Sequence, residues 1–287
     1  AACIAGVFSL EAGLKLIAER ARLMSALPRD GDMVTVFANE TQVATAIKPY
    51  AQLVSIAAVN GPESIVISGQ RETINVLISQ FDNEGIKTKP LNVSHAFHSP
   101  LMVSLLPEFE RIVRSITLSP PQIDFISNLT GNIATEEITT PDYWCQHIRQ
   151  PVKFAASIET LYQQGYEVFL EIGPRPALLG MARQCLPDNI GVWLPSLRPG
   201  QSDWQQLLHS LGDLAVRGTP VDWRGFDQDY QRARVTLPTY PFQRKRYCLE
   251  RQETRWGLKP QTAKLHPLLD QKIQSPLLKE TLFETRF

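Results

Sequence analysis

The chain has no excess of charge of either sign, because 29 lysines and arginines balance 29 aspartates and glutamates among its 287 residues. Binding to nucleic acid requires a basic face that replaces phosphate counterions, and this composition gives no support for one. No apolar run reaches the roughly 18 residues of a membrane span, and the first residues lack the basic start and cleavage site of a signal peptide. We therefore expect a cytoplasmic protein with neither nucleic acid nor membrane as a partner.

Cysteine is scarce and scattered along the chain. No Cys-x-x-Cys spacing occurs, and no histidine lies at the intervals that zinc ligands require. The four cysteines are Cys3, Cys145, Cys185 and Cys248. The sequence therefore predicts free thiols and no metal site. The chain also contains no Gly-x-Ser-x-Gly sequence, the turn that presents a nucleophilic serine in many acyl-transfer enzymes.

Two of the five histidines lie three positions apart, in a segment that stops at Pro100. His95 and His98 are therefore expected in a loop between folded elements. Histidine is the side chain whose ordinary pKa is nearest physiological pH, so either one is a candidate general base. A loop histidine is more often a surface residue or a satisfied polar residue, and residue type alone leaves both interpretations open.

The first helix is expected directly after Ser9, which can cap it, with Glu11 in its first turn. Apolar residues follow at helical spacing and predict a stripe packed on a core. This stripe comprises Leu10, Leu14, Ile17, Ala21 and Met24. Lys15, Glu19 and Arg22 lie on the opposite face, so Arg20 falls at the border of the predicted buried stripe.

Further along, short β-rich runs and amphipathic helices alternate, which favours an α/β protein with a mainly parallel sheet. Strands are expected at residues 33–38, 53–59, 64–68, 123–127, 168–172 and 192–197. Helices are expected at residues 72–83, 105–116, 152–164 and 204–216. The polar segment 251–264 has no periodicity and is typical of a flexible connection.

Several motifs together resemble the acyltransferase domain of modular polyketide synthases, in the order of that family. They are His-Ala-Phe-His at 95–98, Ala-Ala-Val-Asn-Gly-Pro at 57–62, Tyr-Trp at 143–144, Pro-Val-Lys-Phe at 151–154, Glu-Ile-Gly-Pro at 171–174 and Leu-Pro-Thr-Tyr-Pro-Phe-Gln-Arg-Lys-Arg-Tyr at 237–247. The resemblance covers roughly residues 1 to 250. Residues 265–287 are similar to the opening strands of a dehydratase domain, whose catalytic histidine lies beyond this segment, so His266 receives no such role.

The resemblance implies an acyltransferase fold with an α/β-hydrolase-like parallel-sheet core and an inserted ferredoxin-like α+β subdomain. The implied large subdomain comprises residues 1–30 and 95–187, and the small subdomain residues 31–94. A post-acyltransferase linker is expected at 188–250, followed by the connection at 251–264 and the dehydratase start at 265–287. Residues 2–8 match what normally follows the serine turn, so the nucleophile is expected about five positions before Ala1, and the fragment alone is expected to be inactive.

The resemblance also implies the chemistry, which is transfer of a malonyl group from malonyl-CoA to the phosphopantetheine thiol of an acyl carrier protein through a seryl ester. His98 is then the base, and a backbone carbonyl at or near His147 orients it. Arg20 pairs with the malonyl carboxylate, a role that suits the forked guanidinium. His-Ala-Phe-His accompanies malonyl in this family, so Phe97 is expected to fill the space of an α-methyl group.

His95, in the specificity motif, and Asn60, near the substrate entrance, complete the implied substrate-binding set. No cofactor is expected beyond the acyl-CoA substrate and the carrier's phosphopantetheine. The implied partners are the acyl carrier protein and the adjacent ketosynthase and dehydratase domains. Two alternatives stay open, an inactive structural or docking fragment and a stand-alone α/β hydrolase with another nucleophile, for which Cys3 is the candidate.

Overall fold

The computed structural model describes residues 1–231, 233, 235–245, 269, 271–273, 277 and 281–285. It divides into two compact units, Ala1–Asp222 and Trp223–Phe287. Within the described ranges, no helix combines the length and the apolar character needed to cross a membrane.

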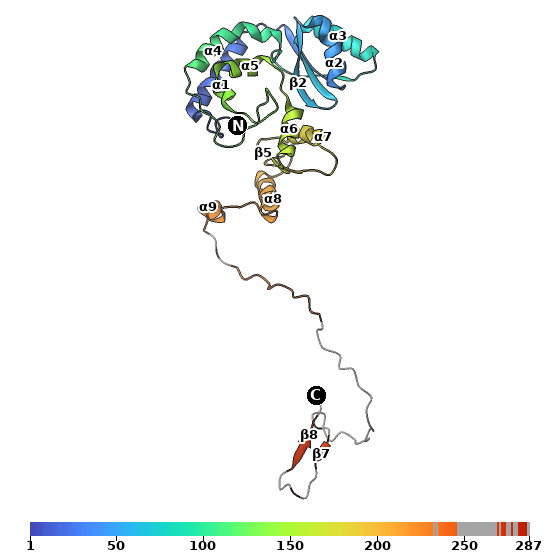
Figure 1. The fold of residues 1–287 in the computed structure, drawn as a ribbon, viewed down its shortest axis with the longest axis vertical. Helices are drawn as coiled ribbons and strands as arrows, with labels where there is room; N and C mark the ends of the chain where they lie inside the picture. The colour runs from blue at the N-terminus through green and yellow to red at the C-terminus, as the bar shows by residue number, and fades with distance from the viewer. Residues whose placement is uncertain are drawn as a thin grey trace. The chain divides into compact units, whose positions relative to one another are not determined.

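The first unit contains a four-stranded antiparallel sheet with the strand order β2-β3-β1-β4 (Figure 1). Its elements are β1 (Gly31–Val36), α2 (Glu40–Ile47), η1 (Lys48–Tyr50), β2 (Val54–Gly61), β3 (Ser64–Gln70), α3 (Arg71–Asn83) and β4 (Thr88–Pro90). The chain order strand, helix, strand, strand, helix, strand is that of a ferredoxin-like unit. The expected inserted α+β subdomain is therefore present.

Alternation along β3 explains why this sheet is buried on both faces. Ile65 and Ile67 point to the layer formed by α2 and α3, and they join a cluster with Leu77 and Phe81, all at most 1% exposed. Val66 points the other way and packs with the segment around Phe97. The helix α2 was absent from the sequence expectation. It begins at the cap Asn39, whose side chain accepts a hydrogen bond from the Gln42 amide.

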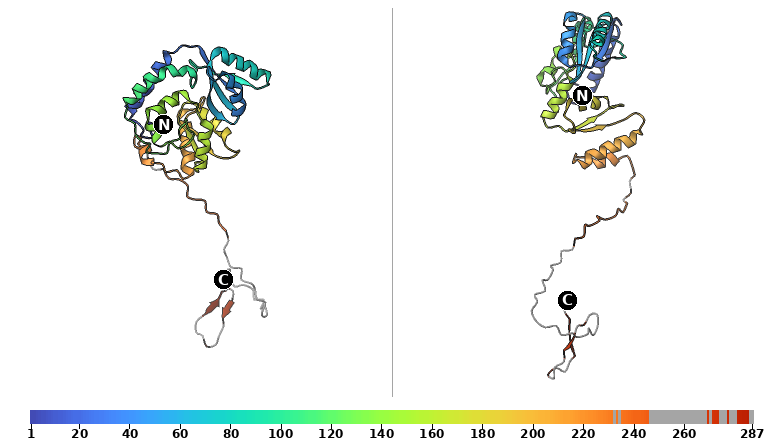
Figure 2. Two further views of the ribbon diagram at one scale, coloured as in Figure 1. Left: turned by 45° about the horizontal axis from the view of Figure 1, so that its top comes forward. Right: turned by 90° about the vertical axis from the view of Figure 1, so that its right-hand side faces the viewer.

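A helical layer packs beside this sheet and is built from α1 (Leu10–Ser25), the short helix η2 (Pro100–Leu105), α4 (Leu106–Arg114), η3 (Glu136–Thr139) and α5 (Pro141–Arg149), as Figures 1 and 2 show. Its core includes Met102, Phe109, Val113 and Ile148. Ser9 caps α1 by accepting a hydrogen bond from the Ala12 amide, as the sequence predicts.

The buried face of α1 differs from the predicted one. Leu10, Leu14 and Ile17 are 56% to 68% exposed, whereas Leu16 and Met24 are buried. Leu23 and Leu27 pack on the same core as Leu16. The helix carries two apolar stripes, and periodicity alone cannot tell which of them meets the core. Arg20 lies four residues after Leu16 and three before Leu23, so it belongs to the buried stripe and not to its border.

The remainder of the first unit contains the parallel pair β5 (Val168–Glu171) and β6 (Val192–Pro195). It is accompanied by α6 (Phe154–Gln163), α7 (Ala177–Cys185) and α8 (Asp203–Val216). The predicted strand at 123–127 is wrong. Within the described part of the chain, this segment forms only an isolated bridge, from Ile126 to Ile133, and pairs with no strand. Ile123 is 56% exposed.

The second unit contains α9 (Trp223–Asp227) and an antiparallel pair, β7 (Gln271–Ile273) and β8 (Leu282–Glu284). The two strands agree with the expectation of strands near the C-terminus, and their assignment to a dehydratase stays a prediction. The expected connection at 251–264, His266 and Cys248 lie outside the described residues.

Candidate active site

His98 lies in the histidine loop, residues 94–99, between β4 and η2. Its backbone has a φ of +57°, the left-handed region that is uncommon for residues other than glycine. The Ser55 hydroxyl donates a hydrogen bond to the His98 carbonyl over 2.8 Å. The ring nitrogen Nδ1 lies 2.8 Å from the Gln150 carbonyl oxygen. A carbonyl only accepts, so Nδ1 carries the proton in neutral His98 and Nε2 is left as the basic nitrogen.

The Gln150 carbonyl is placed by the segment that follows α5. Val152 pairs with the edge of β2, donating its amide to the Ala57 carbonyl over 2.8 Å and accepting from the Val59 amide over 2.9 Å. This pairing carries Gln150 to the histidine loop. The expectation of an orienting carbonyl near His147 is thus correct for the segment but wrong for the residue, because helical geometry directs the His147 carbonyl along α5 and only the residue after the helix can turn toward His98.

Close contact between β1 and the histidine loop depends on Gly31. A β-carbon at this position would lie 2.5 Å from the Ala96 β-carbon and 2.7 Å from a Leu101 methyl group. The loop is pinned from within as well, because the buried Ser99 hydroxyl donates to the Ala96 carbonyl and also accepts from the Leu101 amide. The loop is therefore packed directly against the sheet.

Arg20 extends from the buried stripe of α1 into the same region. Burial lowers the pKa of its guanidinium, and its positive charge lowers the pKa of both His98 and His147. Among the described residues, the guanidinium has no ion pair or hydrogen-bond partner. A partly buried guanidinium without an acidic partner has donors free to bind an anion.

Both charges that act on His98 are positive, namely those of Arg20 and Arg149. Burial is the main cause that lowers the pKa of His98, the two arginines lower it further, and the bond to Gln150 opposes them. Burial also lowers the pKa of His147 to about 4, with smaller contributions from Arg20 and His98. Both imidazoles are therefore neutral at pH 7, as a general base must be before it takes a proton.

His147 enters the site through its side chain. Its ring lies 6.2 Å from Tyr143 and 6.0 Å from Trp144, centroid to centroid. Its Nδ1 is buried and has no hydrogen-bond partner among the described residues. The helix α5 thus lines the site with a neutral imidazole at His147 and with Arg149.

His95 and Phe97 lie in the histidine loop but point into the interior. His95 is 3% exposed, and its ring nitrogens bond the Ser94 hydroxyl at 3.0 Å and the Leu27 carbonyl at 3.1 Å. Both ring nitrogens of His95 thus have partners inside the protein, and its role in substrate binding stays a prediction. Phe97 is half-buried and packs on both the helical core and the sheet.

Asn60 and Cys3 stand apart from this arrangement. Asn60 is the penultimate residue of β2 and the turn follows it at Pro62, while its carbonyl lies 3.4 Å from the Cys185 thiol. Cys3 is a half-buried free thiol, as are Cys145 and Cys185. Within the part of the chain that the structure describes, no hydrogen bond or ring contact joins Asn60 or Cys3 to His98.

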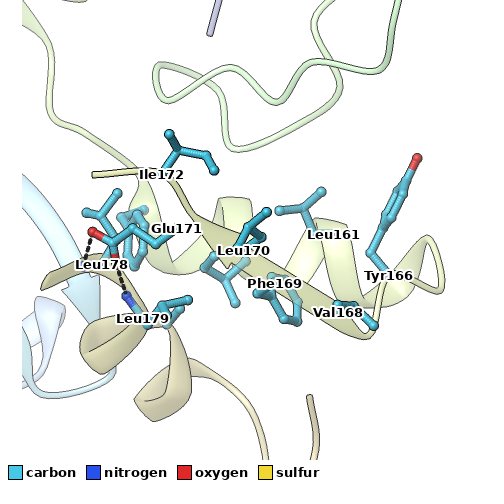
Figure 3. Close-up of a pocket in the computed structure, with 12 residues that line it drawn as sticks. Leu161, Tyr166, Val168, Phe169, Leu170, Glu171, Ile172, Leu178 and Leu179 are labelled. Carbon is cyan, nitrogen blue, oxygen red and sulfur yellow. Dashed lines mark hydrogen bonds between the residues drawn. The ribbon is translucent and has the colours of Figure 1, made fainter. Parts of the chain in front are cut away.

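A separate hollow of about 370 Å³ lies at β5, α6 and α7 and is lined almost entirely by apolar side chains (Figure 3). Its one carboxylate, Glu171, accepts hydrogen bonds from the backbone amides of Leu178 and Leu179 at the start of α7, as the dashed lines in Figure 3 show. This carboxylate is occupied, and neither histidine nor arginine lines the hollow. This hollow therefore lacks the basic and titratable side chains that gather around His98.

The sequence analysis missed Gln150 and Ser55, the two residues that hold His98 directly. Gln150 precedes the motif at 151–154, so its neighbourhood was indicated but its role was not. Nothing in the sequence indicates that Ser55 contacts His98, because a serine within a strand is ordinary.

Comparisons with known proteins identify the family of the chain. The acyl transferase domain family matches residues 1–221. The spectinabilin polyketide synthase system protein NorB of Streptomyces orinoci is 40% identical over 279 residues, which are 94% of this chain and 13% of that protein. Polyketide synthase GfsB of Streptomyces halstedii is 40% identical over 87% of this chain and 5% of its own length. This chain therefore spans only a small part of these relatives.

Solved structures show the same fold. The acyltransferase domain from the second module of the salinomycin polyketide synthase superposes with a TM-score of 0.77 at 38% identity, covering 84% of this chain and 57% of that chain. The acyltransferase domain of ZmaA superposes with a TM-score of 0.76 at 33% identity, over 83% and 56%. FabD from Acinetobacter baumannii, 23% identical with a TM-score of 0.68, shares the fold. This chain belongs to the acyl transferase domain family, in the group found in polyketide synthases.

Proposed function

We propose that this chain is part of an acyltransferase that moves a malonyl group from malonyl-CoA to the phosphopantetheine thiol of an acyl carrier protein. In that reaction this chain supplies His98 as the base and Arg20 as the carboxylate ligand. One observation carries the proposal. A basic Nε2 on His98 shares its surroundings with a partly buried Arg20 guanidinium that has no acidic partner among the described residues. Such a pair fits an acyl donor that carries a free carboxylate.

The proposed reaction proceeds in two balanced halves. A serine hydroxyl, which we place in a segment N-terminal to Ala1, attacks the thioester carbonyl and gives its proton to His98 Nε2. Collapse of the tetrahedral intermediate breaks the carbon–sulfur bond, and His98 returns the proton to the sulfur of coenzyme A. In the second half the carrier thiol loses its proton to His98, attacks the seryl ester and releases the serine, which regains the proton.

Binding of the substrate would also adjust the base. Arg20 lowers the pKa of His98 in the free protein. A malonyl carboxylate on Arg20 offsets that positive charge, so the pKa of His98 rises when the correct acyl group is bound. The base then becomes stronger in the presence of an acidic acyl donor than with an uncharged one.

The test uses this chain extended upstream to include the serine turn, with radiolabelled malonyl-CoA and acetyl-CoA as donors. We expect His98→Gln to lower malonyl transfer by at least a thousandfold. Arg20→Ala should lower transfer of malonyl about ten- to a hundredfold more than transfer of acetyl, because one charge-assisted pair is lost. Arg22→Ala is the matched control, since Arg22 is exposed on the same helix and pairs with Glu19.

Several outcomes would overturn the proposal. If Arg20→Ala weakens malonyl and acetyl transfer equally, Arg20 does not bind the carboxylate. Stable label on Cys3 of the 287-residue chain itself would favour the hydrolase alternative. Absence of label on the extended protein would favour a structural or docking fragment.

Specificity for malonyl over methylmalonyl is proposed to depend on Phe97. The ring is packed between the helical core and the sheet, so it has little freedom to move away from a substituent. One methyl group is worth a preference of about ten- to two-hundredfold in such a pocket. Phe97→Ser should reduce that preference, and an unchanged ratio of the two transfer rates would remove the steric explanation.

The proposed partners follow from the chain's relatives, which are multidomain synthases. We infer that the acyl carrier protein supplies the accepting thiol and that neighbouring ketosynthase and dehydratase domains belong to the same polypeptide. The described residues Leu237, Tyr240 and Phe242 are 65% to 78% exposed, which is consistent with the expected linker that packs on a neighbouring domain.

A further inference from the structure

Ser55 contacts the histidine loop from another part of the fold. It lies on β2 of the antiparallel sheet, whereas the Gln150 carbonyl that bonds the His98 ring lies after α5. The Ser55 hydroxyl donates to the His98 carbonyl over 2.8 Å. His98 is thus held at two points, its main chain from β2 and its ring from the segment after α5.

The main-chain contact matters because His98 has a left-handed backbone. In the described residues, only His98 and Asn189 combine a positive φ with a side chain. Such a conformation persists when surrounding contacts determine it. The Ser55 bond fixes the direction of the His98 carbonyl, and with it the peptide orientation that directs the ring toward Gln150.

A second contact orients Ser55 itself. Arg149 Nη1 lies 3.4 Å from the Ser55 hydroxyl oxygen and donates to it, so the hydroxyl proton is left to point at the His98 carbonyl. The two hydrogen bonds therefore run in one direction, from Arg149 to Ser55 and from Ser55 to His98. Arg149 and Gln150 are adjacent, so both points that hold His98 are tied to the end of α5.

We propose that Ser55, which lies in the small subdomain, is a positioning residue. Its hydrogen bond to the His98 carbonyl holds the His98 imidazole in position. Ser55 does not touch the reacting atoms. Its effect passes through the backbone of His98 to the Nδ1 bond with Gln150, and that bond selects the tautomer in which Nε2 is basic. The catalytic importance of this positioning rests on the proposed function, but its structural effect does not.

The chain offers a closely matched control at Ser68. Ser55 and Ser68 are directly opposite on β2 and β3. Ser68 is fully buried, and its hydroxyl oxygen has no hydrogen-bond partner among the described residues. Ser55→Ala and Ser68→Ala therefore remove the same atom from the same face of the sheet, and only the first removes the contact to His98.

The first experiment needs no catalysis and uses the 287-residue chain. Nitrogen-15 NMR of the histidine rings reports the tautomer and the pKa of His98. Ser55→Ala should lower the share of the Nδ1–H tautomer and, because the bond to Gln150 raises the pKa of His98, move that pKa further below its ordinary value. Ser68→Ala should change neither. Ser55→Thr, which keeps a hydroxyl, should restore the wild-type signals, and its isostere Ser55→Val should not.

The second experiment measures malonyl transfer in the upstream-extended protein. Ser55→Ala should lower kcat about ten- to a hundredfold, as expected for a misplaced catalytic group, with little change in KM. Unchanged tautomer and pKa in both Ser55→Ala and Ser55→Val would overturn the inference, and so would an equal response of Ser68→Ala. If the NMR signals respond while no variant, including the wild type, transfers malonyl, the positioning role stands and the proposed function fails.

Discussion

The antiparallel sheet and the β5–β6 pair differ in how fully their apolar side chains are buried. Every large side chain facing α2 and α3 from β3 is shielded from solvent. In contrast, Val168, Leu170 and Ile172 are 39%, 42% and 78% exposed. The sheet formed by β1 to β4 draws its strands and covering helices from one continuous stretch of chain, so neighbouring segments close it. The histidine loop therefore packs against a sheet whose side chains are already well buried on its other face.

The largest effect is expected from the same substitution made in each region. Leu77 is fully buried and Leu170 is 42% exposed. Leu77→Ala should lower the free energy of unfolding by about 2 to 5 kcal/mol, because it leaves a cavity. Leu170→Ala should lower it by about 1 kcal/mol or less. Chemical denaturation of both variants measures the difference, and equal losses would contradict the comparison.

The next effect concerns His147 and tests whether burial on α5 is as complete as in the antiparallel sheet. The pKa of His147 is about 4 in the folded chain and near 6.5 when unfolded. The unfolded state therefore binds the proton more readily, so this contribution to stability is complete above about pH 6.5 and is lost as the pH falls toward 4. His147 alone should account for up to about 3 kcal/mol of that loss.

The measurement is urea unfolding of the wild type and of His147→Asn at several values of pH. The variant should lose less stability on acidification, because it has no imidazole to protonate. His209→Asn is the control, since the His209 side chain is 77% exposed. Parallel pH dependence in the wild type and His147→Asn would show that the imidazole of His147 is not kept neutral by burial.

A smaller effect is expected at Gly69, where the strands of the antiparallel sheet approach closely. An added β-carbon would lie 2.2 Å from the Leu53 carbonyl oxygen and 2.7 Å from the Val54 α-carbon. Both are backbone atoms and cannot rotate away. Gly69→Ala should therefore cost about 1 to 3 kcal/mol of stability. Thermal unfolding is the measurement, and an unchanged midpoint would mean that β2 and β3 are less tightly joined.

The smallest effect has the opposite sign and lies in the more open region. Gly180 is inside α7, and an added β-carbon would meet no atom within 4 Å. Gly180→Ala should raise the free energy of unfolding by about 0.4 to 1 kcal/mol, because alanine has less backbone freedom to lose on folding. A loss of stability in the same thermal assay would indicate a neighbour at this position.

Much of the fold could be predicted because local patterns determine it. The start of α1 at the Ser9 cap, the strands β1 to β3 and the helices α3, α6 and α8 all lie close to their expected positions. The missed helix α2 is short, and the wrong strand at 123–127 is an apolar run whose partner strand is absent from the described fold. Short apolar runs do not distinguish strand from loop without knowledge of their neighbours.

The roles assigned to the residues of the candidate site stay predictions. His98 and Arg20 were identified through a family resemblance, and the structure brings them close enough for the charge of Arg20 to act on His98. A substrate role for His95 stays a prediction, and the structure adds that its ring nitrogens bond the Ser94 hydroxyl and the Leu27 carbonyl, which the loop motif alone did not reveal. The exposed stripe of α1 shows the same difficulty, since two apolar stripes compete and only packing selects one.

The amino-acid sequence by itself determined which residue types were available and where helices and strands begin, because backbone geometry acts over a few residues. Only the tertiary structure decided that Gln150 and Ser55 form hydrogen bonds with His98. These partners lie 52 and 43 positions from His98 in the chain. A hydrogen bond at that separation forms because β2, the histidine loop and the end of α5 pack together, and no local pattern records that packing.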